Sequence, residues 1–409
     1  MAKPPPRQEG QPAVSESFPA PARDQTLLRR ANELSLLAVL RDGHPRSLRE
    51  VSQATGLSWR TTQVVAQGLS ANGWLAESDA VAEPAGRKAI GRPARRFRFV
   101  AEAGHVVGLD VGVHRVQAFV ANLTAEIVGT GTVVVSPGDP APIRLDAARS
   151  ALHAALADAA LTPFNVWAAV MGISGIVGPN GNVTASDLLP GWTGLDPGKS
   201  LSTLLACGVQ VANDANLAAL GERWRGHQAN TMIHVLVGTR LGAGLLIDGR
   251  LHRGAAGAAG EIGALRGAGW PDAAQRLISA DIAEDVPDNI DIKADRVFAA
   301  ARSGQPTALN AIDRFAADIA HGIAAMVLTV DPELVVVGGG FAHAADLLLP
   351  RIEAELAVTC PHPPQLQASD LGDDAVALGA LRLALDTVDR RMTELDSAAP
   401  LVHAAIRGR

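Results

Sequence analysis

The sequence has two cysteines, no long apolar run and no apolar core near its N-terminus. Cys207 and Cys360 are too few for a disulfide framework, and they show no metal-binding spacing. No stretch of about 18 apolar residues occurs, which argues against a membrane-spanning helix. The first residues do not resemble a secretion signal. We therefore expect a cytoplasmic protein with no membrane anchor.

Charge is distributed unevenly along the 409 residues. Residues 23–100 hold 13 Lys and Arg against 7 Asp and Glu, whereas residues 101–409 hold 21 against 33. A small basic module joined to a larger acidic body is typical of a nucleic-acid-binding protein with a separate sensing domain. The length also exceeds one compact core and predicts two or three domains.

Composition and charge suggest how the chain is divided. Residues 1–22 are rich in Pro, Ala, Gln and Ser, so we expect a disordered tail. We predict a DNA-binding domain over residues 23–100, a sensing body over residues 101–390 and a C-terminal tail over residues 391–409.

The basic module contains the signals of a helix-turn-helix. Ser47 and Glu50 form a capping box that begins one short helix, and Gly56 suits its C-terminal end. Ser58 can cap a second helix over residues 59–71. In such a motif the first turn of the second helix enters the major groove. The candidate DNA contacts are therefore Ser58, Arg60, Thr61, Thr62 and Gln63, with Arg60 best suited to guanine.

Residues 74–77 and 96–99 can pair as strands around a loop rich in Ala, Gly and Pro, which predicts a wing. Within this loop, Gly91-Arg92-Pro93 can place an extended Arg92 in a minor groove. A solvated basic loop without a function is the alternative. The adjacent helix-turn-helix favours DNA binding.

Asn213 and Asp214 end a short apolar run, and helical periodicity follows them. A strand-to-helix turn would place this amide and carboxylate at the edge of a cleft, which suits recognition of a polyol. The carboxylate could also take a proton from a sugar hydroxyl that attacks a phosphate. On this stretch alone, helix capping by Asp214 or Asn216 is the simpler interpretation.

Glycine-rich corners follow three other apolar runs of the body, at residues 108–112, 238–244 and 338–340. A carboxylate in a glycine-rich loop, Glu261, is better explained by ligand hydroxyls than by packing. A polar loop around Asp187 is of a kind that closes on a sugar. The corners recur in two similar halves, which predicts a duplicated α/β fold with a ligand cleft between its lobes.

Together these features resemble the ROK family, which groups sugar-responsive repressors with sugar kinases on an actin-like ATPase fold. The resemblance extends from about Leu27 to Thr387. It implies a two-lobed α/β body, and the preceding winged helix-turn-helix resembles the repressor branch. The residues that carry it are Asp110-Val111-Gly112, Asn213-Asp214-Ala215-Asn216, Gly238 to Gly244, Gly260-Glu261-Ile262-Gly263 and Val337-Gly338-Gly339-Gly340.

The resemblance also implies roles for particular residues. Asn213, Asp214 and Glu261 match sugar contacts, and Asp214 would be the catalytic base of a kinase. Asp187 stands where the family usually has Asn, which alters the expected pattern of ligand hydroxyls. The positions that match a nucleotide site, which we expect to be degenerate, are Asp110, Gly112, Gly238, Thr239 and Gly339.

Three departures from the family pattern decide how the resemblance is interpreted. His114, after Val113, occupies a phosphate corner where the kinases have Gly-Thr, and Arg240 replaces a glycine of the second corner. Arg240 could pair with a phosphate, but we expect these bulky side chains to fill the ATP pocket and so to disfavour kinase activity. Ala264 replaces a zinc-binding histidine, and residues 265–295 contain no cysteine. We therefore expect no zinc and no other cofactor.

The sequence thus predicts a DNA-binding transcriptional regulator of carbohydrate metabolism, interpreted as a repressor, with a sugar or sugar derivative as effector. We expect a homodimer or dimer of dimers on an inverted-repeat operator. One alternative is an ATP-dependent sugar kinase of the same family. Another is a body that has lost ligand binding and serves only as a dimeric platform.

Overall fold

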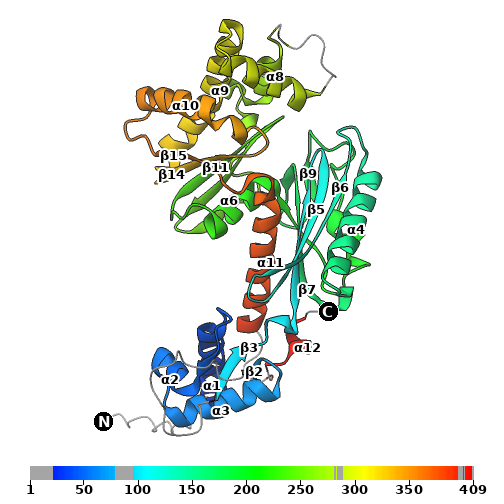
Figure 1. Cartoon of the computed structure of the whole chain (residues 1–409), viewed down its shortest axis with the longest axis vertical. Coiled ribbons are helices and arrows are strands. Elements are labelled where there is room, and N and C mark those ends of the chain that lie inside the picture. The colour runs from blue at the N-terminus through cyan, green and yellow to red at the C-terminus, as the bar shows by residue number, and fades with distance from the viewer. Residues whose placement is uncertain are drawn as a thin grey trace, which may run out of the picture.

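The computed structural model describes residues 22–78, 95–280, 282, 289–394, 399 and 401–407. The molecule is elongated, with α1, α2 and α3 at one end and α8, α9 and α10 at the other (Figure 1). Across these residues, no helix combines the length and apolar character needed to cross a membrane.

The N-terminal module pairs short helices with an antiparallel sheet of order β1-β3-β2. The predicted capping box is present, because the Ser47 hydroxyl accepts from the Glu50 N–H at 3.3 Å and the Glu50 carboxylate accepts from the Ser47 N–H at 2.6 Å. Gly56 ends that helix at φ 71°, and Ser58 Oγ accepts from the Thr61 N–H at 3.1 Å to begin the next. The elements are α1 (Ala22–Leu40), β1 (Arg46–Ser47), α2 (Leu48–Thr55), α3 (Trp59–Ala71), β2 (Leu75–Ser78) and β3 (Arg96–Phe99).

The first lobe of the body is built on a sheet of order β10-β7-β4-β5-β6. Strands β4, β7 and β10 are parallel, and β5 and β6 continue from β4 as the predicted antiparallel meander. Helices α4 and α11 cover opposite faces of this sheet (Figure 1). The elements are β4 (His105–Val111), β5 (Arg115–Asn122), β6 (Ile127–Val134), α4 (Ala141–Asp158), β7 (Val166–Ile173), β8 (Ile176–Val177), β9 (Val183–Ala185), α5 (Pro197–Ser202), β10 (Gln210–Asn213) and α11 (Ala375–Glu394).

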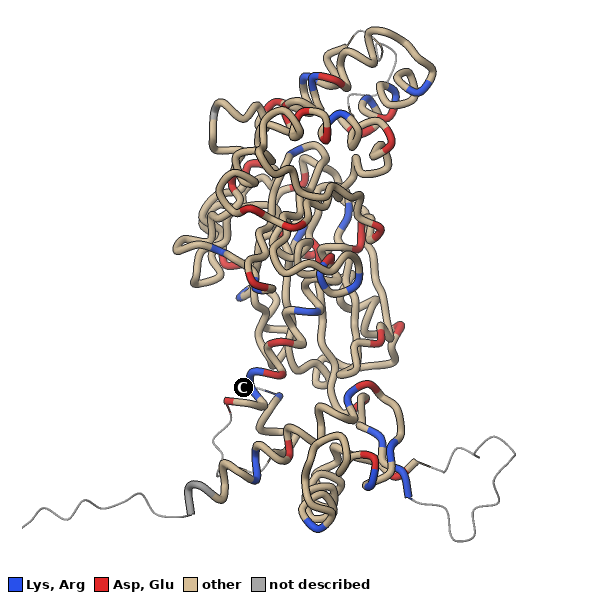
Figure 2. The backbone as a smooth tube through the Cα atoms, turned by 90° about the vertical axis from the view of Figure 1, so that its left-hand side faces the viewer, with Lys and Arg blue, Asp and Glu red and all other residues tan. Residues whose placement is uncertain are grey.

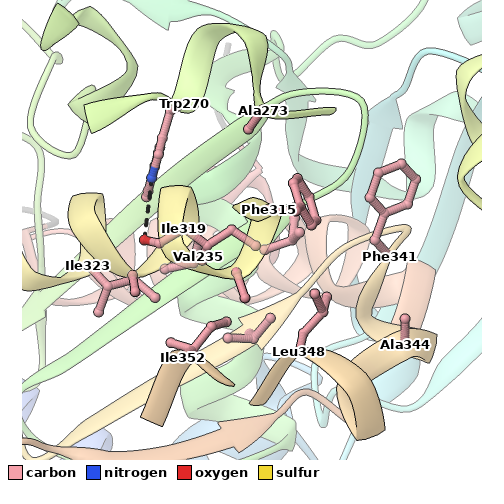
Figure 3. Packing of buried hydrophobic residues seen from close by; sticks show 14 of the residues in the cluster. Val235, Trp270, Ala273, Phe315, Ile319, Ile323, Phe341, Ala344, Leu348 and Ile352 are labelled. Atoms are coloured by element: carbon pink, nitrogen blue, oxygen red, sulfur yellow. Dashed lines mark hydrogen bonds between the residues drawn. The ribbon is translucent and has the colours of Figure 1, made fainter. Parts of the chain in front are cut away.

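The second lobe repeats this plan with a sheet of order β13-β12-β11-β14-β15, which confirms the predicted duplication. In its core the Trp270 indole N–H donates to the carbonyl oxygens of Asp318 at 3.0 Å and Ile319 at 3.4 Å. Figure 3 shows the bond to Ile319. A Cβ on Gly322 would lie 2.3 Å from the same ring, so only glycine fits there. The elements are α6 (Asp214–Arg225), β11 (Met232–Val237), β12 (Leu241–Ile247), β13 (Arg250–His252), α7 (Ala273–Ile278), α8 (Ile290–Arg302), α9 (Pro306–Val330), β14 (Leu334–Gly338), α10 (Ala345–Thr359) and β15 (Gln365–Ala368).

Helices α6 and α11 cross at backbone contact. A Cβ on Gly379 of α11 would lie 1.7 Å from the Leu217 carbonyl oxygen of α6. A Cβ on Gly221 of α6 would lie 2.3 Å from the Ala375 carbonyl oxygen of α11. Each helix therefore contributes a glycine that lets the other approach. From this crossing α11 runs along the first sheet to the N-terminal module (Figure 1).

A tryptophan joins the N-terminal module to the body. The Trp74 ring lies edge-on to Trp167 of β7, with ring centroids 5.8 Å apart, and its indole N–H donates to the Leu401 carbonyl oxygen at 2.8 Å. The His403 ring, at the start of α12 (His403–Ile406), lies 4.5 Å from the Trp74 ring. Module, first lobe and C-terminal segment therefore share one hydrophobic core.

The C-terminal division differs from the sequence expectation. The boundary drawn at residue 390 falls inside α11, which continues to Glu394. Residues 401–407 pack on the core instead of forming a free tail, because Leu401 and Ile406 are fully buried. The predicted tail over residues 1–22 lies almost wholly outside the described residues.

Replacing Gly379 with Ala should destabilise the protein. Alanine is favoured over glycine by about 1 kcal/mol inside a helix, but the added Cβ would overlap the Leu217 carbonyl oxygen. We expect a net loss of about 2–3 kcal/mol in the free energy of unfolding, as for other overpacked sites. Urea denaturation measures it. Gly138→Ala, where a Cβ would meet nothing within 4 Å, is the control; equal stability of both variants would contradict a backbone contact.

Candidate ligand-binding cleft and DNA-reading surface

A cavity of about 450 Å³ lies between the two lobes. It brings together the four predicted ligand-binding residues and three of the five predicted nucleotide positions. Asp110 and Gly112 do not line it. The predicted residues that line the cavity are Asp187, Asn213, Asp214, Glu261, Gly238, Thr239 and Gly339.

Asn213 uses its side chain to build the site. Its carboxamide oxygen accepts from the Asn216 N–H at 2.9 Å and thereby caps α6. Its amide group donates to the Gly175 carbonyl oxygen and to Asp214 Oδ1, both at 3.1 Å. Both amide protons thus have protein acceptors. The capping interpretation is correct for this turn, with Asn213 as the cap in place of Asp214 or Asn216.

Asp214 sits at the N-terminus of α6, where its Oδ1 also accepts from the Ala215 N–H at 2.8 Å. Burial raises the pKa of Asp214 to about 6, although hydrogen bonds from the Ala215 N–H and the Ser174 hydroxyl oppose the rise. Burial, together with the charge of Asp214, raises the pKa of Asp110 to about 7. A carboxylate with a raised pKa is suited to accept hydroxyl protons near neutral pH.

Two further carboxylates face the same cavity from other elements. Glu261 follows a glycine-rich turn of the second lobe and is partly buried, whereas Asp187 is exposed on a loop of the first lobe. Burial, with the nearby charge of Asp187, raises the pKa of Glu261. The cavity is therefore lined by acceptors from both lobes, an arrangement suited to a ligand rich in hydroxyl groups.

The phosphate corners are filled by the protein's own side chains. His114 Nε2 of the first lobe lies 2.5 Å from Asp291 Oδ2 of the second, and the Thr239 hydroxyl donates to Asp291 Oδ1 at 3.1 Å. The Arg240 guanidinium donates to the Pro271 carbonyl oxygen at 2.9 Å. These four side chains and Pro271 all line the cavity. A nucleoside triphosphate would meet these side chains in the corners, and its phosphates would have to displace the contact between His114 and Asp291 that links the lobes.

Metal-binding groups are not gathered at this cleft. Within the described part of the chain, no group of three His, Cys, Asp or Glu side chains is placed to hold a metal ion. Ala264 lines the cavity. Cys207 and Cys360 pack in the cores of different lobes.

The first turn of α3 presents two of the predicted DNA contacts to solvent. Arg60 and Gln63 are exposed, and Ser58 with Thr61 forms the exposed cap. Thr62 was wrongly included among the contacts: it is fully buried, and its hydroxyl donates to the Ser58 carbonyl oxygen at 3.0 Å. Position 62 falls on the inward face of the helix, so its side chain packs in the core.

Sequence reasoning missed part of this face. Trp59 and Val64 are 55% and 62% exposed, and Gln67 is also exposed. They share a face with Arg60 and Gln63 at helical spacing, a signal available in the sequence. Lys and Arg recur among some Asp and Glu at the end of the molecule that carries α3, whereas both kinds of charge are scattered over the body (Figure 2). Arg92 lies outside the described residues.

Fold and site together define a two-lobed α/β protein with an interlobe ligand cleft and an attached helix-turn-helix module. The ROK family matches residues 106–387, and the chain therefore belongs to the ROK family. The xylose repressor of Caldicellulosiruptor bescii is 24% identical over 393 residues, which cover 88% of this chain and 97% of that repressor.

Two solved structures have the same fold. A ROK family transcriptional regulator, a homolog of the E. coli MLC protein, superposes with a TM-score of 0.67 at 20% identity, over 93% of this chain and 99% of that one. A ROK family glucokinase from Streptomyces griseus, in complex with glucose and AMPPNP, gives a TM-score of 0.58 at 26% identity, over 69% of this chain and 100% of the glucokinase. The similarity to the regulator thus covers more of this chain than the similarity to the glucokinase.

Asp110 should make stability depend on pH. Its pKa is raised from 3.8 to about 7, so its stabilising contribution is full below pH 3.8 and is lost as the pH rises through 7. Asp110→Asn removes this ionisation. We expect the variant's stability relative to wild type to increase by about 2–3 kcal/mol between pH 5 and pH 8. Urea denaturation at both pH values measures the change, and Asp146→Asn on α4 is an exposed control. A difference independent of pH would contradict the buried carboxylate.

Proposed function

We propose that the chain is a DNA-binding transcriptional regulator of carbohydrate metabolism, a repressor whose effector is a sugar or sugar derivative. The observation that carries this proposal is the pairing of a carboxylate-lined interlobe cavity with an exposed face on α3. The long similarity to a xylose repressor supports it. We place its action in the cytoplasm, where the DNA is.

In this proposal the ligand's hydroxyl groups donate to carboxylates of both lobes. Asp214 and Glu261 provide the partly buried acceptors, and Asp187 closes over the ligand from the first lobe. Asn213 orients Asp214 through the 3.1 Å hydrogen bond between their side chains and is a positioning residue. No zinc or other cofactor takes part, because Ala264 and the separated cysteines provide no ligand set.

The proposed mechanism is a population shift. A ligand that binds both lobes favours one interlobe arrangement over another. Helix α11 contacts α6 beside the cavity and reaches the core around Trp74, so it connects the lobes to the DNA-reading module. In a symmetric dimer, such a change would alter the spacing of two copies of α3 and hence the fit to an inverted repeat.

The kinase alternative retains Asp214 as a base and belongs to the same family. The ion pair of His114 with Asp291 and the contact of Arg240 with Pro271 weigh against it, since they occupy the phosphate corners. The platform alternative would leave the cavity without a ligand. The partly buried carboxylates of Asp214 and Glu261 weigh against that alternative, because burial makes their charged forms costly and raises the pKa of both.

A sugar effector should stabilise the protein against heat in a manner that depends on Asp214. A ligand at 100 times its dissociation constant should stabilise the folded state by roughly 2.7 kcal/mol. Thermal unfolding against sugars, amino sugars and sugar acids identifies the ligand. Asp214→Ala should abolish the ligand-induced shift, whereas Asp146→Ala, which removes an exposed carboxylate of α4, should keep it.

Two outcomes of this experiment would contradict the proposal. Turnover of ATP with magnesium and a hexose, abolished by Asp214→Asn, would establish the kinase. If no sugar stabilised the protein against heat while operator binding stayed intact, the dimeric platform would be favoured.

Replacing Arg60 with Ala should weaken binding to an operator selected from random duplexes. Loss of a guanidinium that reads a base costs about 1–3 kcal/mol, and it should also relax the preference for one base. Fluorescence anisotropy at fixed salt measures both effects. Arg314→Ala removes an exposed charge from α9 and should change neither. Unchanged operator affinity in the Arg60 variant would remove that residue from the interface.

A further inference from the structure

A second cavity, of about 690 Å³, opens beside the first. It runs along β10, the edge strand of the first sheet, and is bounded by α5 and by the segment after β13. This volume lies within the range of small-molecule sites. We call it the edge groove. Asn213 lines both cavities, so the first turn of α6 separates them.

The edge groove has the opposite charge from the interlobe cavity. Lys199, Arg253 and Arg390 line it, and Asp196 is the one carboxylate among the described residues that line it. The Asp196 carboxylate already accepts from the Lys199 backbone N–H at 3.0 Å. Carboxylates predominate in the interlobe cavity, as described above. An anionic molecule would therefore be repelled from one cavity and attracted to the other.

The described residues offer no partner to the side chains of these three cations. None of the three makes a hydrogen bond or an ion pair within that part of the chain. Other arginines are engaged: Arg144, for example, donates to five backbone carbonyl oxygens. Cations from α5, from the segment after β13 and from α11 thus converge on one groove with their donors unpaired.

A buried amide supplies a second, independent sign of a ligand. Asn216 lines the groove, is 4% exposed, and its carboxamide oxygen has no hydrogen-bond partner among the residues described. A buried polar atom without a partner is costly, and native proteins rarely retain one without a purpose. An acceptor at this place suits a hydroxyl donor from a bound molecule.

We propose that the edge groove is a second binding site, for a small phosphorylated molecule that also carries hydroxyl groups. Arginine and lysine are the residues that bind phosphoryl oxygens, and Asn216 accepts from a hydroxyl. The proposal does not depend on the function assigned to the interlobe cavity.

The groove also joins the lobes, which gives its ligand a structural effect. Lys199 belongs to the first lobe, and Arg253 follows β13 of the second. Beside them, Gly257 approaches β8 so closely that a Cβ would lie 2.2 Å from the Val177 carbonyl oxygen. An anion held by cations from both sides would resist separation of the lobes here.

Isothermal titration of the full chain with glucose 6-phosphate, inorganic phosphate and glucose tests the proposal. Glucose 6-phosphate should bind wild type, and more tightly than the other two probes. Its Kd should rise about tenfold in Lys199→Ala and in Arg253→Ala, as for the loss of a charged hydrogen bond. Arg250→Ala is the matched control on the same hairpin and should bind as wild type does.

The lysine and arginines are exposed and make no ion pair with any described residue, so their removal should not impair folding. Arg390→Ala provides a third, independent variant. An unchanged Kd in the Lys199, Arg253 and Arg390 variants would overturn the site. If binding were lost in Arg240→Ala and kept in the Lys199, Arg253 and Arg390 variants, the ligand would instead bind in the interlobe cavity. Equal affinity for phosphate and glucose 6-phosphate would contradict the proposed hydroxyl contact.

Discussion

The crossing of α6 and α11 is the contact on which the rest of the structure depends. Gly221 and Gly379 let two backbones touch where side chains would keep helices several ångströms apart. The N-terminal end of α6 carries Asp214 into the interlobe cavity, and the C-terminal half of α11 enters the core around Trp74. Two helices at backbone contact have little freedom to slide or tilt independently. A change at the ligand cavity is therefore tied to α11.

The turn at Asn213 shows how a structural role can support a proposed functional one. Capping fixes the Asn213 side chain, and the fixed side chain then donates to Asp214. The sequence presented capping and ligand contact as competing interpretations because both use the same residue types. The structure confirms the cap, and the proposed part of Asn213 in the ligand site is to hold Asp214 in place.

Much of the fold could be predicted because local signals agree with the global arrangement. The capping box at Ser47, the meander and the two glycine-cornered halves all depend on short-range chemistry. The predictions failed at positions whose burial is set by contacts with residues far away in the sequence. Thr62 is turned into the core by the position of its helix, and residues 401–407 are held by Trp74, more than 300 positions away. The pairing of His114 with Asp291 could not be predicted from the sequence either, because no local pattern links a hairpin tip to a helix in the other lobe.

The contact between His114 and Asp291 explains in physical terms what the departures from the family pattern do. A corner built for phosphate leaves backbone N–H groups and space for an anion. Here the carboxylate of Asp291 takes that place, held by His114 from one lobe and Thr239 from the other. Because the Asp291 carboxylate belongs to the protein itself, no anion has to bind at this corner. The two lobes therefore contact each other there without a nucleotide. In the proposed function, closure then depends on what occupies the remaining cavity, whose carboxylates are suited to hydroxyl groups. A corner that already holds a carboxylate of the protein would favour sensing of a polyol over transfer of a phosphate, as that proposal requires.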